Sequence, residues 1–501
     1  MTALPSLLAV ALVTVMTLAL GTWGVRLSRT SSDFMVASRT VRPGMNAAAV
    51  SGEYLSGASF LGIAALLLTF GAEVLWYPVG WTAGYLVLLT LVAAPLRRSG
   101  AYTLPDFAEA RLASPLVRNV CSTLVVAIGW LYLVPQMEGA GITLTAATGA
   151  PSWVGPVVVG AVVLVAVAGG GMRSITLVQA FQYWLKLTAL LVPAAVLLAV
   201  WAADDARPTV GAAGAWSTPL TSDVAGLYTT YSLILATFLG TMGLPHVVVR
   251  FYTSPDGRAA RRTTLGVLAL VGGFYLLPPA YAALGRAYGV ADDATLVLDL
   301  PRLVVPGVVG DVLTGLVTAG AFAAFLSTSS GLAVAVSGVL TQDVTSRGLP
   351  GIRTMSDITA FRLAAIISVV VPTLAALALP NLGIARAVGL AFAVAASTFC
   401  PLLLLGIWWR RLTPPGAVAG LLTGGAGSMA AVAWSMGHGG FADSDAWLDV
   451  LLTQPAAWTV PMAFTVMIVV SLLTRSRVPA HTQRFLVRLH TPEALELERA
   501  P

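Results

Sequence analysis

Four consecutive hydroxyl residues, 327–330, lie near the middle of a stretch that is long and apolar enough to cross a lipid bilayer. The stretch covers residues 318–343 and reads TAGAFAAFLSTSSGLAVAVSGVLTQD. Ala324, Ser327 and Thr328 are spaced i, i+3 and i+4, which places them on one face of a helix. Because membrane hydrocarbon offers hydroxyls no hydrogen-bond partner, this face predicts a polar site inside the protein.

A second stretch, residues 47–62, predicts a helix that is interrupted in the middle of the membrane. Its central part, 51–59, reads SGEYLSGAS and contains two glycines, three serines and the ionisable Glu53. An interrupted membrane helix leaves backbone carbonyls free, and such carbonyls coordinate small cations. Hydroxyls on one helix that face bare carbonyls on a broken helix would bind a small hard cation. We therefore expect a cation-driven solute transporter.

A matching interruption is predicted later in the chain. Residues 240–245 read GTMGLP and place two glycines and Pro245 inside the apolar run 225–250. Each interruption would lie in the first helix of a five-span half, 45–201 and 225–409, as in transporters built from inverted repeats. Ordinary kinks are the alternative, because glycine and proline are common in membrane helices. The paired placement favours the repeat.

Ionisable side chains inside apolar runs are rare and usually functional. An acid at the centre of a membrane helix costs about 2.5–3.5 kcal/mol, so Glu53 and Glu138 are candidate proton carriers or gating residues. The alternative is that each bonds backbone freed by nearby glycine or proline. His246 is more simply a packed histidine than a proton relay. Lys186, close to the end of a run, is expected to extend its amine toward the membrane surface.

Composition agrees with a multi-pass α-helical membrane protein. Of 501 residues, 57% are hydrophobic and 10% are charged, whereas soluble proteins have about 25% charged residues. Thirteen apolar runs approach the roughly 20 residues that a membrane helix needs. These runs cover residues 4–26, 45–71, 73–96, 115–147, 153–170, 174–201, 225–250, 264–287, 305–343, 358–380, 384–409, 415–437 and 458–474.

Loop charges predict the orientation in the membrane. Arginines gather in alternate loops, which marks those loops as cytoplasmic and places the N-terminus outside and the C-terminus inside. They are Arg26, Arg29, Arg39, Arg42, Arg97, Arg98, Arg111, Arg173, Arg250, Arg258, Arg261, Arg262, Arg347, Arg353, Arg410 and Arg411, followed by Arg475, Arg477, Arg484 and Arg488 in the tail. The opposite loops carry Asp204, Asp205, Asp292, Asp293, Asp443 and Asp445. A multi-pass protein of the cytoplasmic (inner) membrane is expected.

Several other function classes find no support in the sequence. The arginines follow the spans, so the net charge of +6 does not indicate a nucleic-acid partner. No P-loop, dinucleotide fingerprint, HExxH or GxSxG stands in a usable context, so an enzyme is not expected. Cys121 and Cys400 lie in apolar runs and read as core residues. A large cytoplasmic signalling domain would favour a membrane sensor, and the short tail 475–501 provides none. No obligate protein partner is predicted.

Specific motifs add a family resemblance. GGMRSITLVQAFQ at 170–182, AFAAFLSTSSGLAVAVSGVLTQDV at 321–344 and TLPDF at 103–107 resemble segments of the sodium:solute symporter family. Residues 46–71 and 238–264 are similar to its cation/acetate symporter branch, which transports acetate and other short monocarboxylates. Residues 102–112, around TLPDF, read as a short interfacial helix opened by a proline and an aspartate; a solvated connector is the alternative.

The resemblance implies the leucine-transporter fold, which has two inverted repeats of five helices plus peripheral helices. It implies sodium as the co-transported ion, with Ala324, Ser327 and Thr328 of the hydroxyl helix as ligands. On the broken helix it implies the carbonyls of Gly52 and Leu55, or of Ser51 and Tyr54 if the alignment shifts by one residue. Many relatives have an aspartate where this chain has Gln179, so one sodium ion per cycle is the simplest expectation.

A small carboxylate would be bound by backbone N–H groups and positive dipole ends at the start of half-helices. The candidate residues are Ser56, Gly57, Ser59, Gln136, Gly240 and Thr241. The expected activity is sodium-coupled import of a monocarboxylate such as acetate, propionate or pyruvate. The alternatives are another solute (proline, pantothenate or a sugar), or proton coupling through Glu53 or Glu138.

The expected organisation has six parts. They are a peripheral helix with its loop (1–44), the first repeat (45–201), an extracellular loop (202–224), the second repeat (225–409), two peripheral helices (410–474) and a cytoplasmic tail (475–501).

Overall fold

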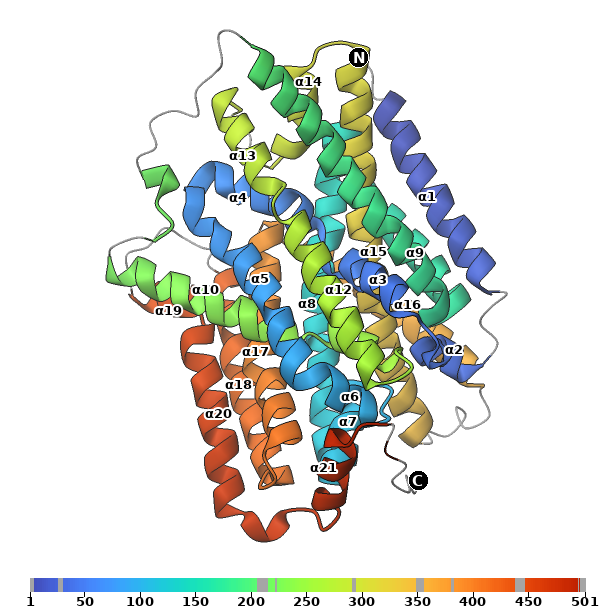
Figure 1. Cartoon of the computed structure of the whole chain (residues 1–501), viewed down its shortest axis with the longest axis vertical. Helices are drawn as coiled ribbons and strands as arrows, with labels where there is room; N and C mark the ends of the chain where they lie inside the picture. Colours follow the sequence, from blue (N-terminus) through green and yellow to red (C-terminus); the bar gives the residue numbers. More distant parts are fainter. Residues whose placement is uncertain are drawn as a thin grey trace.

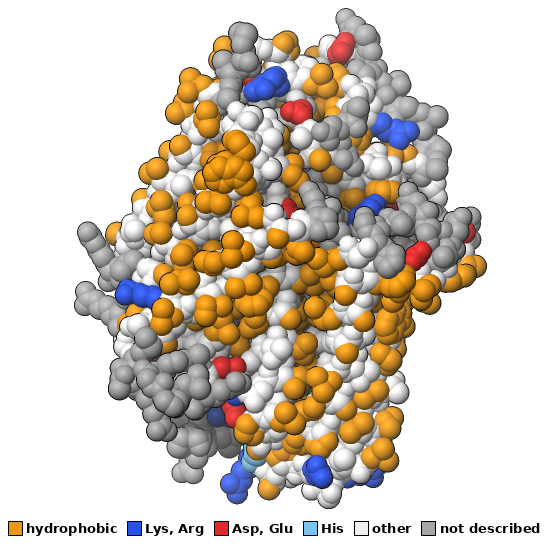
Figure 2. Space-filling view, turned by 180° about the vertical axis from the view of Figure 1, so that it is seen from behind, with side chains coloured by type: hydrophobic (Ala, Val, Ile, Leu, Met, Phe, Trp, Pro, Cys, Tyr) orange, Lys and Arg blue, Asp and Glu red, His pale blue; other side chains and the backbone are white. Residues whose placement is uncertain are grey.

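The computed structural model describes residues 4–25, 30–204, 215–220, 223–290, 294–347, 356–379, 383–437, 447–493 and 495. These residues form an elongated bundle of helices without a β-strand (Figure 1). Seen from behind, hydrophobic side chains are spread over most of the described surface and charged ones are sparse (Figure 2). Leu4, Leu8 and Leu12 on the first helix are each at least 60% exposed, as expected for side chains that face lipid.

The first half contains α1 (Leu4–Val25), α2 (Ser31–Val36), α3 (Pro43–Tyr54), α4 (Ile63–Phe70), α5 (Trp76–Val87), α6 (Ala93–Arg98), α7 (Leu104–Leu112), α8 (Pro115–Thr148) and α9 (Val154–Ala203). The second contains α10 (Val224–Gly243), α11 (Pro245–Tyr252), α12 (Gly257–Phe274), α13 (Pro278–Ala287), α14 (Leu296–Val304), α15 (Val308–Arg347), α16 (Asp357–Ala378), α17 (Ile384–Trp408), α18 (Pro414–Gly437), α19 (Trp447–Thr453), α20 (Ala456–Leu473) and α21 (Thr482–His490).

Eleven helical segments of the described residues are long and apolar enough to cross a membrane. Two of them, Ala58–Arg98 and Val154–Ala203, each reach across two of the predicted spans. In the second, Gly171 has φ 56° and ψ −155°, a conformation that essentially only glycine adopts. A side chain there would also collide with Phe34. This glycine therefore separates two helices at the boundary between the predicted spans 153–170 and 174–201, while the count of thirteen separate spans stays a prediction.

Both predicted helix interruptions are present. The α-helix α3 ends at Tyr54, Leu55 has ψ 86° instead of a helical value, and a π-helical turn over Ala58–Gly62 leads into α4. In the second half α10 ends at Gly243, Leu244 is extended, and α11 begins at Pro245. Proline cannot supply an amide N–H and fixes its own φ, which suits it to start a new helix. Glycine and proline at these places thus break the helices as the sequence indicates.

The hydroxyl helix α15 runs through the middle of the bundle and packs against α9, α8, α1, α16 and α3. From Thr318 to Val339 nearly all of its residues are buried. Small residues permit this close packing. A methyl group added at Gly320 would come within 2.5 Å of the Ala189 side chain, and one at Gly331 would meet the Glu53 carboxyl at 2.1 Å. The second broken helix, α10, packs against α17 and α5.

The predicted interfacial helix is present as α7. The Thr103 side chain accepts a hydrogen bond from the Asp106 N–H, and Asp106 accepts one from the Thr103 N–H, so the two residues form a capping box. Arg118 then joins α8 to this helix and to α15 through ion pairs with Asp106, Glu109 and Asp343. The structure therefore confirms a helix here instead of a solvated connector.

The first helix starts at one end of the bundle, and the last described helix lies at the opposite end. The start of α1 is at the top of Figure 1 and α21 is at the bottom, as an outside N-terminus and an inside C-terminus require. Many charges behind the predicted orientation fall outside the described residues: Arg26, Arg29, Arg353, Asp205, Asp292, Asp293, Asp443 and Asp445. The orientation therefore remains a prediction.

Candidate cation and substrate site

The hydroxyl helix touches the broken helix where the sequence predicts. The Thr328 hydroxyl donates a hydrogen bond to the Glu53 carbonyl at 2.6 Å. That carbonyl is free because α3 ends one residue later, at Tyr54. Both residues are buried. The interruption thus supplies an acceptor that a continuous helix would have used for its own backbone.

Oxygen atoms from both helices converge beside this contact. The carbonyls of Gly52 and Leu55 and the Ser327 hydroxyl all accept hydrogen bonds from one nitrogen, with the Leu55 and Ser327 oxygens at 2.7 and 2.9 Å. The Ser327 hydroxyl in turn donates to the Ala324 carbonyl at 3.1 Å. This geometry brings together the candidate sodium ligands on α3 and α15. The carbonyls that lie beside Ser327 here are those of Gly52 and Leu55, and their role as sodium ligands stays a prediction.

The nitrogen at this point belongs to Lys186 of α9. The expectation that Lys186 extends to the membrane surface is wrong, because its side chain is fully buried. An ammonium group has three N–H donors, and three oxygens receive them here. Sequence reasoning missed this contact, although one signal was available: Lys186 is the single lysine among 28 basic residues.

A buried ion pair joins the last turn of α3, just before the helix break, to α11. Arg250 of α11 donates from Nε to Glu53 Oε2 at 2.5 Å, and neither side chain is more than 2% exposed. Arg250 also donates to the Thr176 hydroxyl at 2.9 Å. The expectation that Arg250 belongs to a cytoplasmic loop is wrong, because the turn at Pro245 directs α11 back into the bundle. A buried carboxylate with a paired guanidinium satisfies the requirement that buried charges be paired.

Gln179 connects the ion pair to the hydroxyl helix. Its amide nitrogen donates to the Ser327 carbonyl at 2.8 Å, and its amide oxygen accepts from Arg250. An aspartate at this position could accept from the arginine but could not donate to the carbonyl. The amide therefore fits this neutral bridging position, and it adds no negative charge beside the predicted cation.

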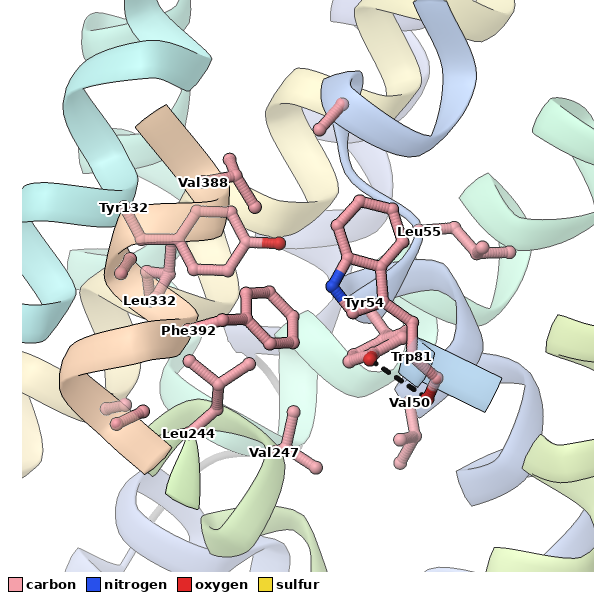
Figure 3. Close-up of a cluster of buried hydrophobic side chains, with 14 of the residues drawn as sticks. Val50, Tyr54, Leu55, Trp81, Tyr132, Leu244, Val247, Leu332, Val388 and Phe392 are labelled. Carbon is pink, nitrogen blue, oxygen red and sulfur yellow. Dashed lines mark hydrogen bonds between the residues drawn. The ribbon is translucent and has the colours of Figure 1, made fainter. Parts of the chain in front are cut away.

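The two helix breaks meet at an aromatic cluster. The Tyr54 hydroxyl bonds to the Thr241 hydroxyl at 2.7 Å and lies 3.2 Å from the Trp81 carbonyl. Phe392 of α17 lies with its ring centroid 5.5 Å from Trp81 and 6.0 Å from Tyr132. Figure 3 shows the Trp81 indole nitrogen and the Tyr132 hydroxyl pointing toward each other from opposite sides of this cluster.

Several buried polar atoms here have no completed hydrogen bond. The Gly57 N–H donates to Gln136 Oε1 at 3.0 Å, which leaves the Gln136 amide nitrogen without a partner. The Trp81 indole nitrogen is also unpartnered. The Ser56 hydroxyl lies beside that of Tyr132 without forming a full hydrogen bond. Unsatisfied buried donors are costly, so these groups have the capacity to bind a polar ligand.

The remaining candidate residues are more fully engaged. The Ser59 hydroxyl bonds to the Tyr275 hydroxyl at 2.8 Å, and the Thr241 hydroxyl donates to the Thr237 carbonyl. Gly240 packs directly on α17, where a side chain would come within 2.5 Å of the Phe392 carbonyl. These three residues therefore shape the site, whereas Gln136 and Ser56 retain hydrogen-bonding capacity.

Glu138 and His246 lie outside the ion-pair network. Glu138 of α8 is half-buried, and the structure gives it no ion pair within the described part of the chain. Its neighbour Gly139 packs against Phe325 and Ile384. His246 is fully buried with its ring 5.4 Å from that of Tyr132, in agreement with a packed histidine.

Trp81 was missed by the sequence reasoning. It lies between Gly80 and Gly84, which are four residues apart and therefore on one face of α5. A methyl group at Gly80 would meet the Thr237 side chain, and one at Gly84 would meet that of Thr241, at 2.5 Å or less. This glycine pair is a small-residue packing signal, and it would have placed Trp81 against the second broken helix.

A cavity of about 280 Å³ lies beside the first break, between α4 and α17. Leu61 and Gly62 line it where the broken helix resumes, and Arg386 lies with its guanidinium 4.8 Å from the centroid of the Phe70 ring. The positive charge of Arg386 therefore lies in the same cavity as the segment that follows the helix break.

Comparisons with known proteins agree with this geometry. The family model described as the sodium:solute symporter family matches residues 34–424. The chain is also 31% identical over 468 residues to "Uncharacterized symporter YwcA" of Bacillus subtilis (strain 168), with 90% of each chain covered. The chain belongs to the sodium:solute symporter family. It is therefore a membrane symporter whose family couples transport to sodium.

Solved structures show the same fold. A Na+-coupled sialic acid symporter in a substrate-bound outward-open state matches with a TM-score of 0.74 and 16% identity, covering 93% of this chain and 98% of that one. Mhp1, a nucleobase-cation-symport-1 family transporter in a closed conformation, matches with a TM-score of 0.57 and 13% identity, covering 92% and 99%. The all-helical fold expected from the sequence is that of these transporters.

Proposed function

We propose that this sodium:solute symporter imports a small monocarboxylate, such as acetate, propionate or pyruvate, by alternating access. The observation that carries the proposal is the set of unpartnered buried donors at the helix breaks. The Gln136 amide nitrogen, the Trp81 indole nitrogen and the Ser56 hydroxyl are all buried without full partners. A carboxylate has acceptors only, so it would satisfy donors of this kind.

The surroundings of these donors favour a small and partly apolar solute. Tyr132 and Phe392 pack beside Trp81, and ligand sites of this kind combine apolar walls with a few oriented polar groups. Resumption of the helix at Ala58 puts backbone N–H groups and a positive dipole end near the same place. Arg386 in the neighbouring cavity would attract an anion on its way to the site.

Sodium would bind to the carbonyls of Gly52, Leu55 and Ala324 and the hydroxyls of Ser327 and Thr328. These oxygens suit a hard cation. Sodium bound there would tie α3 to α15 and so favour the conformation that completes the substrate site next to the break. Alternating access then requires the halves 45–201 and 225–409 to move relative to each other, with the N-terminus outside and the C-terminus inside the cytoplasmic membrane.

Uptake by purified protein in liposomes tests the substrate assignment. Labelled pyruvate is preferable to acetate, because less of it exists as the neutral acid that crosses bilayers unaided. Under an inward sodium gradient we expect uptake that acetate and propionate inhibit, and that proline, pantothenate and glucose leave unchanged. Inhibition by one of these three, with no effect of the monocarboxylates, would contradict the proposal. Gln136→Leu should weaken uptake by raising KM.

A further inference from the structure

Two adjoining grooves follow the last turns of α17 and become basic where that helix ends. The first, of about 430 Å³, is lined by apolar and aromatic side chains that include Leu91 and Ile468. The second, of about 490 Å³, lies between the end of α17 and α21 and includes Arg410. Because Trp408 and Trp409 line both, the two are treated together as the α17 groove.

The apolar part of the α17 groove lies within the membrane-spanning segments. Leu91 and Ile468 are one or two helical turns inside the ends of the segments Ala58–Arg98 and Ala456–Leu473. The basic part lies beyond the end of α17, and none of the described residues that line the groove is acidic. Polarity thus changes along the groove in the same order as from the chains to the headgroup of an anionic phospholipid.

The helix α21, which forms one wall of the basic part, is amphipathic. Phe485 and Leu489 are buried against the bundle, whereas Arg484 and Arg488 are exposed. Basic amphipathic helices of this kind lie at the boundary between lipid chains and headgroups. Tryptophan is also enriched in this layer, and Trp408 is 50% exposed. Figure 2 shows basic side chains at the lower end of the molecule, below a largely hydrophobic surface.

The basic part of the groove offers donors to a phosphate group. Arg410 is exposed and forms no ion pair within the described part of the chain, and a guanidinium can bind phosphate with two parallel hydrogen bonds. The His490 ring packs edge-on against Trp408, with 4.6 Å between the ring centroids. Its Nδ1 donates to the Leu486 carbonyl at 3.0 Å, so a protonated ring could donate to a phosphate from Nε2.

The negative ends of both helices are compensated where the headgroup would lie. At the end of α17, the buried Arg111 donates to the carbonyls of Gly406 and Trp409 at 2.9 and 3.1 Å. At the end of α21, Arg98 donates to the Leu489 carbonyl at 3.2 Å. Free carbonyls at a helix C-terminus would repel an anion, so these hydrogen bonds make the place compatible with a phosphate.

We propose that the α17 groove binds one anionic phospholipid, with an acyl chain along Leu91 and Ile468 and the phosphate at Arg410 and His490. A lipid fits better than a soluble anion, because the basic part continues directly into an apolar groove inside the membrane. Since α21 forms one wall, the bound lipid would hold this helix against the end of α17. The inference does not depend on which solute is transported.

Native mass spectrometry of the purified full-length protein in detergent tests this site. Phosphatidylglycerol, phosphatidylcholine and glycerol phosphate are added in separate titrations. We expect one phosphatidylglycerol molecule to bind at concentrations where neither of the others does. Equal binding of phosphatidylcholine would show that the positive charge does not select the lipid, and equal binding of glycerol phosphate would show that the apolar groove is not used. Either result would overturn the proposal.

Two variants test the two parts of the groove. Arg410→Gln should weaken phosphatidylglycerol binding about fivefold, which corresponds to about 1 kcal/mol for one basic residue beside an anionic lipid. Arg261→Gln, at an exposed arginine of α12 outside the groove, is its control. Ile468→Trp fills the apolar part and should also weaken binding, whereas Val469→Trp, at a side chain 46% exposed outside the groove, should not. Wild-type affinity in folded Arg410→Gln or Ile468→Trp would overturn the proposal.

The wild type provides a second measurement if a variant does not fold. Phosphatidylglycerol with a diazirine in the middle of one acyl chain is added to the protein and activated by light. Peptides that contain residues 404–409 and Ile468 should carry the label, and excess unlabelled phosphatidylglycerol should remove it while phosphatidylcholine does not. Label only on other parts of the chain would contradict the site.

Discussion

The Thr328 hydroxyl lies 2.6 Å from the Glu53 carbonyl, so the hydroxyl helix is bonded directly to the last turn before the first helix break. The two residues are 275 positions apart in the chain. Their contact joins the two inverted halves of the bundle at the proposed sodium site. An ion bound at the proposed site would therefore tie the two halves together.

Thr328→Val removes the hydroxyl with little change in shape. We expect the sodium concentration for half-maximal uptake to rise about tenfold, which corresponds to about 1.4 kcal/mol and to the usual net value of one hydrogen bond or ligand. Initial uptake rates at varied sodium measure the effect. Ser337→Ala is the control, because that hydroxyl lies on the same helix and bonds to the Ala333 carbonyl and to Ser368. An unchanged value for Thr328→Val would exclude Thr328 as a ligand.

Arg250→Met should strongly destabilise the protein, since it leaves the Glu53 carboxylate buried without its partner. Loss of one member of a buried pair costs about 3–5 kcal/mol. We expect a large drop in melting temperature in detergent, and partial recovery in the double variant with Glu53→Gln. If the double variant loses as much stability as the two single variants together, the two side chains of the ion pair do not stabilise each other.

Gly331→Ala should impair folding or transport, because the new methyl group would meet the Glu53 carboxyl at 2.1 Å. Overpacking of this kind costs about 1–3 kcal/mol. The melting temperature and the amount of folded protein in membranes measure the effect. Gly273→Ala on α12 provides a matched control, since its added methyl group has no neighbour within 4 Å. The prediction fails if both variants behave like the wild type.

Trp81→Phe should raise KM for the monocarboxylate more than it lowers the maximal rate at saturating solute. The substitution keeps an aromatic ring but removes the unpartnered indole N–H. Trp184→Phe on α9 is a suitable control, because its side chain is 54% exposed on the outer surface. A KM equal to that of the wild type would remove the indole from the substrate site.

The packing of residues 482–493 against the rest of the protein should depend on pH. Burial would raise the pKa of Glu493, but hydrogen bonds from backbone N–H groups, including that of Gly257, and the charge of Arg98 outweigh it and lower that pKa below its ordinary value. A carboxylate whose pKa is lowered by folding stabilises the docked state above its ordinary pKa, and this stabilisation is lost as pH falls through the lowered value.

Hydrogen exchange of residues 482–493 between pH 3 and pH 7 measures this docking, after correction for the intrinsic pH dependence of exchange. We expect protection to fall at the acid end in the wild type. Glu493→Gln should give weaker protection that varies little with pH. Equal protection in both proteins across this range would show that the carboxylate does not hold the segment.

Sequence reasoning predicted the parts of the site that depend on local backbone and polarity. Gly52 and Gly57 mark a helix break, and the spacing of Ser327 and Thr328 gives the face that meets it, so both follow from the residues nearby. The contact between them was also predicted, because polar groups in a membrane need partners.

Long basic side chains were not predictable in the same way. Arg250 is the last residue of the apolar run 225–250, where extension to the membrane surface is the usual outcome. Lys186 lies twelve residues inside the run 174–201, so the expectation that it extends to the surface misjudged its depth. Their inward direction depends on the break at Gly171 and on the turn at Pro245, and these bring α9 and α11 back against α3. Only the assembled bundle shows that both reach the broken helix.

Coupling between solute and sodium is tested most directly by reversing the driving force. Liposomes containing the purified protein are given an inward pyruvate gradient with equal sodium on both sides, at pH 8.5 and with the membrane potential clamped. Uptake of radioactive sodium should follow the pyruvate gradient in the wild type and be lost in Ser327→Ala. Pyruvate entry without any movement of sodium would contradict a sodium site built from the broken helix and the hydroxyl helix.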